Sequence, residues 1–327
     1  MSRYVAVDGG NSKTDVVIGA SDGSVLATVR GPGSSPHRLG VPRTIALIGE
    51  LISDARARAG LTGEAVLERA EVYLAGADLP AEVEILDRAV GEAGWALKHR
   101  VGNDTFALLR AGTDEPDAVA VVCGAGINCV GLAADGRTAR FLSLGQSSGD
   151  WGGGHHLGPL TLYYAARGED GRGEPTALSA AVTGMFGRPS VEDVSSALHL
   201  GEIPHERIYD LTPVLFAVAA NGDAVAARVV ERQAGEIVSL VRVAAGRLGL
   251  LDAEYGVVLG GSVLAARHPM LHDAVVSGIH AISPRARITV LTTPPVAGAA
   301  LLALDALAAT PDAIHRLRAA TAHDQPG

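Results

Sequence analysis

A succession of strands that occurs twice constrains this chain most strongly. Residues 3–30 predict three consecutive strands, with a glycine turn at Gly9-Gly10 after the first. Residues 118–142 predict the same succession, with a glycine turn at Gly124–Gly126. Turn residues between short β-branched runs are typical of hairpins. A chain of 327 residues is long enough for about two domains. We therefore expect one architecture used twice, although no obvious sequence repeat accompanies it.

The remaining pattern predicts sheets covered by helices. Strands and helices alternate after the first hairpins, which is typical of a mixed sheet with helical layers. A Gly-Thr-Asp-Glu-Pro-Asp stretch at residues 112–117 is the best linker candidate, and residues 155–250 are mostly helical in pattern. Helices are expected at 43–59, 82–93, 105–110 and 296–307, and further strands at 71–75, 97–101, 256–259 and 287–291.

Composition excludes several classes of function. The net charge is −9 and no basic stripe is present, which argues against a nucleic-acid or anionic-membrane surface. No run of about 18 apolar residues suggests a membrane span, and no targeting signal precedes the first strand. Two cysteines, Cys123 and Cys129, are too few for a disulfide framework, and their spacing fits no common zinc site. A reducing cytoplasm is the expected compartment.

The first chemical motif follows the first strand. Asp8 ends that strand, and a glycine-rich turn comes next. Glycines let backbone N–H groups approach a phosphate, and Asp8 is placed to hold a hydrated Mg²⁺ beside it. The spacing is not that of a Walker motif. The alternative is an ordinary hairpin turn. The expected phosphate-binding residues are Gly9, Gly10, Asn11, Ser12, Lys13 and Thr14.

Two further glycine turns follow strands. Gly124, Ala125 and Gly126 join two strands, and a dinucleotide fingerprint would instead require a helix and a third glycine there. Gly260, Gly261 and Ser262 open onto a helix N-terminus, which suits a nucleoside or a phosphate. Taken alone, each of these turns is weak evidence for nucleotide binding. The Gly260–Ser262 turn can be a simple strand-to-helix connection.

Together, the motifs have the order and spacing found in the sugar kinase, Hsp70 and actin superfamily. More narrowly, the chain resembles the N-acetylglucosamine kinase and BadF/BadG/BcrA/BcrD ATPase-like family over residues 3 to about 305. The matching stretches are 7–14, 102–104, 124–129, 149–150, 260–263 and 295–301.

This resemblance implies an α/β fold with two ribonuclease H-like domains, each a mixed sheet flanked by helices. The nucleotide, ATP with Mg²⁺, is expected in a cleft between them. We expect one domain at 1–112, joined by the C-terminal helix at about 296–310. The other is expected at 113–295 and carries a helical insertion.

The resemblance also implies catalytic and sugar-binding residues. Asp104 matches the aspartate that accepts the proton of the sugar hydroxyl, and Asn103 would hydrogen-bond the sugar. The alternative for both is a helix cap. Asp150 matches an aspartate that binds sugar hydroxyls. Trp151 replaces the family's glutamate beside it, and either stacks on a pyranose face or fills an apolar space.

The chain departs from the family pattern at several positions. Ala125 and Ile127 stand where the family has hydroxyl side chains, and Pro36 lies in the neighbourhood of an Asn that touches the sugar. The exact sugar is therefore open.

His155 and His156 do not suggest zinc, because adjacent side chains point in different directions.

The sequence thus predicts an ATP-dependent kinase of N-acetylglucosamine, glucosamine or a related sugar, acting as a cytoplasmic homodimer. One alternative is a BadF-type ATPase that activates a radical enzyme through a cysteine-held iron–sulfur cluster. Another is a non-catalytic, nucleotide-dependent sugar sensor, which would need neither Asp8 nor Asp104.

Overall fold

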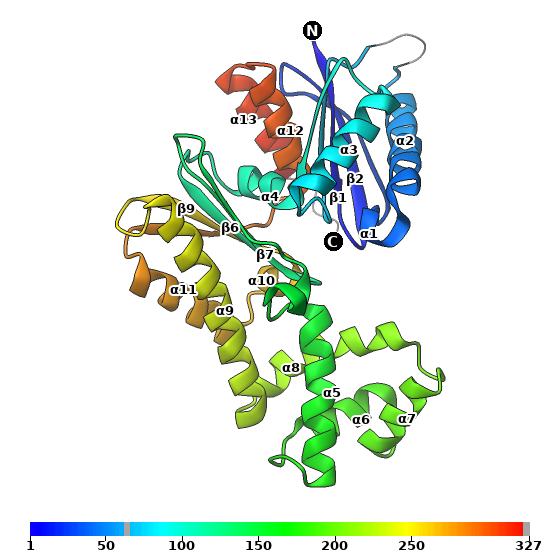
Figure 1. Cartoon of the computed structure of the whole chain (residues 1–327), viewed down its shortest axis with the longest axis vertical. Helices are drawn as coiled ribbons and strands as arrows, with labels where there is room; N and C mark the ends of the chain where they lie inside the picture. Colours follow the sequence, from blue (N-terminus) through cyan, green and yellow to red (C-terminus); the bar gives the residue numbers. More distant parts are fainter. Residues whose placement is uncertain (62–65, 323–327) are drawn as a thin grey trace. The chain divides into compact units, whose positions relative to one another are not determined.

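The computed structural model describes residues 1–61 and 66–322. The chain forms two compact units, both drawn in Figure 1. The first combines the described residues of 1–120, 130–142 and 289–327, and the second combines residues 121–129 and 143–288. The expected division at residue 112 stays a prediction.

The first unit is built on a five-stranded sheet. Its strands are β1 Arg3–Gly9, β2 Lys13–Ala20, β3 Val25–Pro32, β4 Arg69–Leu74 and β5 Lys98–Asn103. They lie in the order β3-β2-β1-β4-β5, with the hairpins antiparallel and the pairs β1–β4 and β4–β5 parallel. Gly9 lies opposite Leu74, and Leu74 lies opposite Asn103. The three parallel strands therefore end together at one edge of the sheet.

Helices cover both faces of this sheet. Alternate side chains of a strand point to opposite faces, so each face presents its own apolar residues to the helices that cover it. Val5 and Val7 belong to a buried cluster with residues of α2 (Val41–Arg58) and α3 (Pro80–Ala93). Tyr4 and Ala6 belong to another. That second cluster includes residues of α4 (Asp104–Gly112), α12 (Pro295–Ala306) and α13 (Pro311–Ala322).

The second sheet repeats the strand succession of the first. It has the order β10-β9-β6-β7-β8, and β7 and β8 are antiparallel. The strands are β6 Ala118–Cys123, β7 Ile127–Leu132, β8 Thr138–Arg140, β9 Tyr255–Gly260 and β10 Ala286–Val290. The predicted α/β class with two sheets flanked by helices is thus confirmed.

Helices make up most of residues 154–248, as the pattern predicted. The longest is α9, which begins after the cap Asp223 and ends before Gly249. The helices of this region are α5 Gly154–Asp170, α6 Leu178–Phe186, α7 Val191–His199, α8 Leu211–Ala220 and α9 Ala224–Leu248. Two helices lie between β9 and β10, namely α10 Ser262–Ala265 and α11 Pro269–Ile282. The short helix α1 spans Pro36–Leu39, and the 3₁₀ turns η1 and η2 span Gly145–Ser148 and His205–Asp210.

Among the described residues, no single helix combines the length and the apolar composition that a membrane span requires. One pair bent by 111°, His205–Ala220 with Ala224–Leu248, meets that test by length and composition only.

Close packing of α12 on α4 depends on a glycine. A Cβ atom on Gly298 would collide with the carbonyl oxygen of Ala107 and lie 2.7 Å from the nitrogen of Ala111. We expect Gly298→Ala to lower the unfolding free energy by about 1–3 kcal/mol, the usual cost of overpacking. Thermal or urea unfolding measures this effect.

Gly235→Ala is the matched control, because nothing lies within 4 Å of a Cβ atom at this exposed position of α9. It should stabilise the protein by about 0.5–1 kcal/mol, as alanine does in a helix interior. Equal effects of the two substitutions would contradict the packing argument.

Candidate active site

Carboxylates gather where the parallel strands of the first unit end. Asp8, at the end of β1, is 8% exposed, and its charge interacts with that of Asp104, the first residue of α4. Burial, helped by the negative charges of Asp104 and Asp15, raises the pKa of Asp8 to about 8. Lys13 and Arg30 oppose that rise only partly. Hard oxygen ligands with excess negative charge fit a hydrated Mg²⁺.

The first glycine turn is closed by backbone hydrogen bonds. The N–H of Gly10 donates to the carbonyl of Lys13 (2.8 Å), and the N–H of Ser34 donates to the carbonyl of Gly10 (3.1 Å). A side chain at Gly9 would collide with Leu74 and with the hydroxyl of Ser34. Only a glycine therefore fits this position.

Two side chains expected at a phosphate have partners within the protein. The Lys13 ammonium lies 3.3 Å from Asp15, and the Thr14 hydroxyl donates to the carbonyl of Pro32 (2.7 Å). Arg30 donates to both carboxylate oxygens of Asp15, at 2.6 and 3.0 Å. Asn11, Ser12 and Lys13 are exposed. Their contact with a phosphate stays a prediction.

Asn103 is the cap of α4. Its Oδ1 accepts from the backbone N–H of Thr105 (3.1 Å) and from the Thr105 hydroxyl. Its Nδ2 donates to Asp78 Oδ1 (2.8 Å), and the side chain is 2% exposed. Asn103 thus caps α4, and its contact with a sugar stays a prediction.

Asp104 is the first residue of α4, and its neighbour Asn103 supplies the cap. Burial and the charge of Asp78 raise the pKa of Asp104 to about 7, although the N–H groups of Thr105 and Asp104 itself lower it. Burial and the charge of Glu82 likewise raise the pKa of Asp78 to about 6. A carboxylate with a pKa near neutrality suits a general base.

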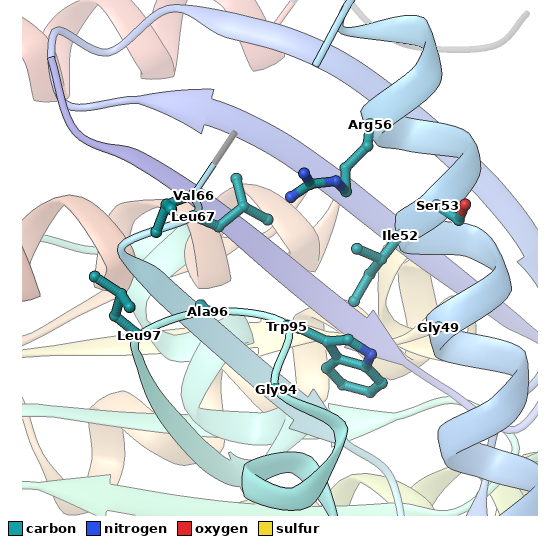
Figure 2. Close-up of a pocket in the computed structure, with 10 residues that line it drawn as sticks. All are labelled: Gly49, Ile52, Ser53, Arg56, Val66, Leu67, Gly94, Trp95, Ala96 and Leu97. Carbon is teal, nitrogen blue, oxygen red and sulfur yellow. The ribbon is translucent and has the colours of Figure 1, made fainter. Parts of the chain in front are cut away.

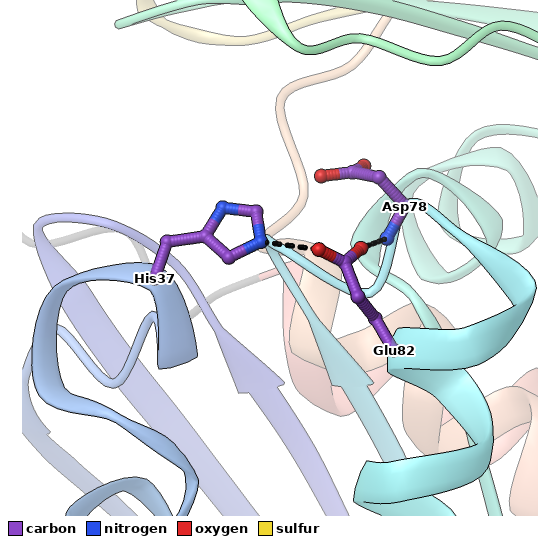
Figure 3. A group of neighbouring side chains, drawn as sticks. All are labelled: His37, Asp78 and Glu82. Carbon is purple, nitrogen blue, oxygen red and sulfur yellow. Dashed lines mark hydrogen bonds and ion pairs between the residues drawn. The ribbon is translucent and has the colours of Figure 1, made fainter.

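A cluster that the sequence analysis missed supports this edge. Figure 3 shows the Glu82 carboxylate between the His37 ring and the backbone of Asp78. His37 Nε2 lies 2.7 Å from Glu82 Oε1, and the N–H groups of Asp78 and Leu79 donate to Glu82 Oε2 (3.0 and 2.8 Å). Pro80 at the start of α3 and an acid two residues later are the sequence signal for such a cap.

Arg140 holds the same turn from β8. Its guanidinium donates to the carbonyl oxygens of Ala77 (3.0 Å) and Asp78 (2.9 Å) and lies 5.7 Å from the centre of the Phe106 ring. This cation also lowers the pKa of Asp78 against the effect of burial. Arg140 therefore links β8 to both the Asp78 turn and α4.

The three glycine turns of the second unit lie together. The carbonyl of Gly124 accepts from the N–H of Gly154 (2.7 Å), and that of Ala125 accepts from the N–H of His155 (2.9 Å). A Cβ atom on Gly261 would lie 2.5 Å from the carbonyl of Cys123. The turns predicted at 124–126 and 260–262 are thus brought into backbone contact, with the 152–155 turn beside them.

Asp150 and Trp151 precede that turn. Asp150 Oδ2 accepts from the N–H of Gly145 (2.9 Å) and from the hydroxyl of Ser148 (2.6 Å). The Trp151 ring lies under the Arg232 guanidinium, 4.4 Å away, and beside His156, whose ring centre is 4.8 Å distant. Both residues are partly buried. Their contact with a sugar stays a prediction.

A cavity of about 490 Å³ lies elsewhere in the first unit (Figure 2). It is lined by Leu67 and Leu97, which precede β4 and β5, and by Trp95 and Ile52. These are the starts of the parallel strands, whereas Asp8 and Asn103 lie at their ends. The cavity is therefore separate from the carboxylate edge.

Comparison with known proteins decides the family. The model of the BadF/BadG/BcrA/BcrD ATPase family matches residues 5–303. The chain belongs to this family.

Two proteins similar to this chain are named as sugar kinases. The N-acetylmuramic acid/N-acetylglucosamine kinase of Clostridium acetobutylicum is 28% identical over 81% of this chain and 86% of its own length. The N-acetyl-D-glucosamine kinase of Dictyostelium discoideum is 26% identical over 92% of this chain and 98% of its own.

A solved structure shows the same fold. It is described as a candidate N-acetylglucosamine kinase from Chromobacterium violaceum, with a TM-score of 0.73 and 21% identity. The match covers 92% of this chain and 99% of that one. The resemblance inferred from the motifs is thereby confirmed.

The raised pKa of Asp8 predicts how stability depends on pH. Folding favours the protonated carboxyl, so the unfolding free energy falls as pH rises from the unfolded pKa toward about 8. Asp8→Asn removes the buried charge and should make the ligand-free protein more stable than wild type above pH 8, with a flatter profile. Melting temperatures across this range provide the measurement.

Asp273→Asn, at an exposed position of α11, is the control and should leave the profile unchanged. The opposite result would be a wild-type protein whose stability increases as pH rises toward 8, with Asp8→Asn abolishing that increase. This result would contradict the burial of the Asp8 charge.

Proposed function

We propose that this protein is an ATP-dependent kinase that phosphorylates a hydroxyl of an amino sugar, N-acetylglucosamine, glucosamine or a close relative. The observation that carries the proposal is Asp104, the first residue of α4, whose carboxylate has its pKa raised to about 7 by burial and by the charge of Asp78. The names of the relatives support the same activity.

Asp104 would act as the general base. Its carboxylate accepts the proton of the sugar hydroxyl as that oxygen bonds to the γ-phosphorus of ATP. The bond from this phosphorus to the bridging oxygen breaks, and ADP leaves. Asn103 and Asp78 hold the start of α4, where Asp104 is the first residue.

Asp8 and the glycine turns would bind the nucleotide. Mg²⁺, held through water by Asp8, would neutralise phosphate charge. Backbone N–H groups of the Gly9–Thr14 and Gly124–Gly126 turns would bind the phosphates, apart from those of Gly10 and Gly124, which donate within their own turns. Gly260–Ser262 would lie near adenosine. Asp150 would orient the sugar, and Trp151 would either stack on it or close an apolar space.

Two further parts of the proposal come from the sequence. A protein with net charge −9 and two unpaired cysteines suits the cytoplasm. The family resemblance motivates a homodimer, which light scattering of the purified protein tests.

The activator alternative is weakened by the cysteines. Cys123 and Cys129 are 0% and 1% exposed, and burial holds the pKa of both thiols above its usual range. A cluster bridging two subunits needs exposed thiolates. Iron in the purified protein would revive this alternative.

Asp104→Asn tests the base. It keeps the shape of the side chain but removes the proton acceptor, so kcat should fall by about 10²–10⁴-fold while ATP affinity is retained. In wild type, kcat/KM should rise with pH through about 7, because Asp104 must lose its proton to act. Rates with a panel of amino sugars, measured against pH, provide the test.

Melting temperature and binding of a non-hydrolysable ATP analogue control for folding of Asp104→Asn. Near-normal turnover by a folded variant would end the assignment. Wild-type protein that binds nucleotide and sugar without any turnover would favour the sensor alternative.

Asp150→Ala tests sugar orientation. Loss of the carboxylate should raise KM for the sugar and also lower kcat, since the hydroxyl is no longer aligned. Steady-state rates at varied sugar concentration measure both constants.

Ser148→Ala is the matched control, because it removes the 2.6 Å bond to Asp150 within the same turn but keeps the carboxylate. If Ser148→Ala raised KM as much as Asp150→Ala, the effect would belong to the turn and not to the carboxylate.

A further inference from the structure

A buried amide on α9 stands out because it is only half satisfied. Gln233 is 0% exposed, and its Oε1 accepts from the N–H of Gly153 (3.1 Å). Its Nε2 has no partner, a condition shared by only three other buried side-chain polar atoms within residues 1–61 and 66–322. An unpaired buried donor costs free energy that an apolar side chain of similar size would not cost. Gln233 therefore calls for a reason other than stability.

The contact with Gly153 supplies that reason. Gly152 and Gly153 both have positive φ angles, +118° and +79°. A Cβ atom on Gly152 would lie 2.6 Å from Gln233 Nε2, so the amide fills the space behind this turn. Gly153 N–H points at the amide oxygen. Gln233 thus fixes the turn by shape and by a hydrogen bond.

The Gly152-Gly153 turn also shapes the Gly124–Gly126 loop. A Cβ atom on Gly153 would lie 2.6 Å from the carbonyl carbon of Gly126, which shows how closely the two backbones approach. The N–H groups of Gly154 and His155 donate to the carbonyls of Gly124 and Ala125. With these carbonyl oxygens occupied, the peptide planes of the loop are fixed in orientation.

We propose that Gln233 is a positioning residue for nucleotide binding, which holds the Gly152-Gly153 turn and through it the phosphate-binding loop Gly124–Gly126. This inference rests on the proposed function of that loop. Asp150 has its own anchors in Gly145 and Ser148, so sugar binding should depend much less on Gln233. The role is thus specific to the nucleotide.

Gln233→Met tests the proposal, because methionine has a similar length but no strong acceptor for Gly153 N–H. The dissociation constant of a non-hydrolysable ATP analogue, measured by calorimetry, and KM for ATP should rise roughly tenfold, the equivalent of about 1.4 kcal/mol. KM for the sugar should stay within about twofold. Gln233→Glu keeps the acceptor oxygen and should restore nucleotide affinity, even with a lower melting temperature.

Val241→Ala is the matched structural control. Val241 is equally buried on α9 but lies eight residues further along, so its truncation lowers stability without touching the turn. It should lower the melting temperature and leave both KM values unchanged.

Three outcomes decide the matter. Selective loss of nucleotide affinity in Gln233→Met, with rescue by Gln233→Glu, supports the proposal. Nucleotide affinity unchanged in a folded Gln233→Met overturns it while leaving the kinase proposal intact. Wild-type protein that binds no ATP analogue overturns the proposed function itself, and with it this role for Gln233.

Discussion

The parallel pairing of β1 with β4 and of β4 with β5 is the constraint on which the first unit's chemistry depends. Parallel strands in register end at one edge, so Gly9, Leu74 and Asn103 lie side by side. Asp8 lies one residue before the end of β1, Asp78 follows β4 by four residues, and Asp104 directly follows β5. Burial disfavours the charged form of each carboxylate, and neighbouring negative charges disfavour it further. The raised pKa values of Asp8, Asp78 and Asp104 are the direct consequence.

The turns of the second unit are marked by close approach of backbone segments, whereas the strand ends of the first unit are marked by buried charges. Gly153 against Gly126 and Gly261 against Cys123 leave no room for a Cβ atom. Beside the first of these approaches, the N–H groups of Gly154 and His155 donate to the carbonyls of Gly124 and Ala125, and Gln233 supports the Gly152-Gly153 turn from behind. A site built from backbone N–H groups needs this support, because such groups bind only when their direction is fixed.

Much of this could be predicted from the sequence, because strand ends and glycine turns are local signals. The strands, the turns at 9–14, 124–126 and 260–262, and the family followed from them. The His37–Glu82 pair, the Arg140 contact and Gln233 could not be foreseen, since their partners lie 45, more than 60 and 80 residues away in sequence. Asn103 was assigned to a sugar or a cap, and only the structure could show which bonds its amide makes.

These features share a thermodynamic character that argues for function. A carboxylate that folding forces toward protonation, and an amide whose donor is buried without a partner, both lower stability. Neutral or apolar residues of the same size would avoid that loss, as natural cores usually do. Asp8 and Asp104 lie where a cation and a hydroxyl proton would relieve the charge, and Gln233 lies behind a turn that needs an acceptor. Asp8 and Asp104 are thus destabilising groups at positions where a ligand would supply the missing interactions, which is what a binding site requires of a fold.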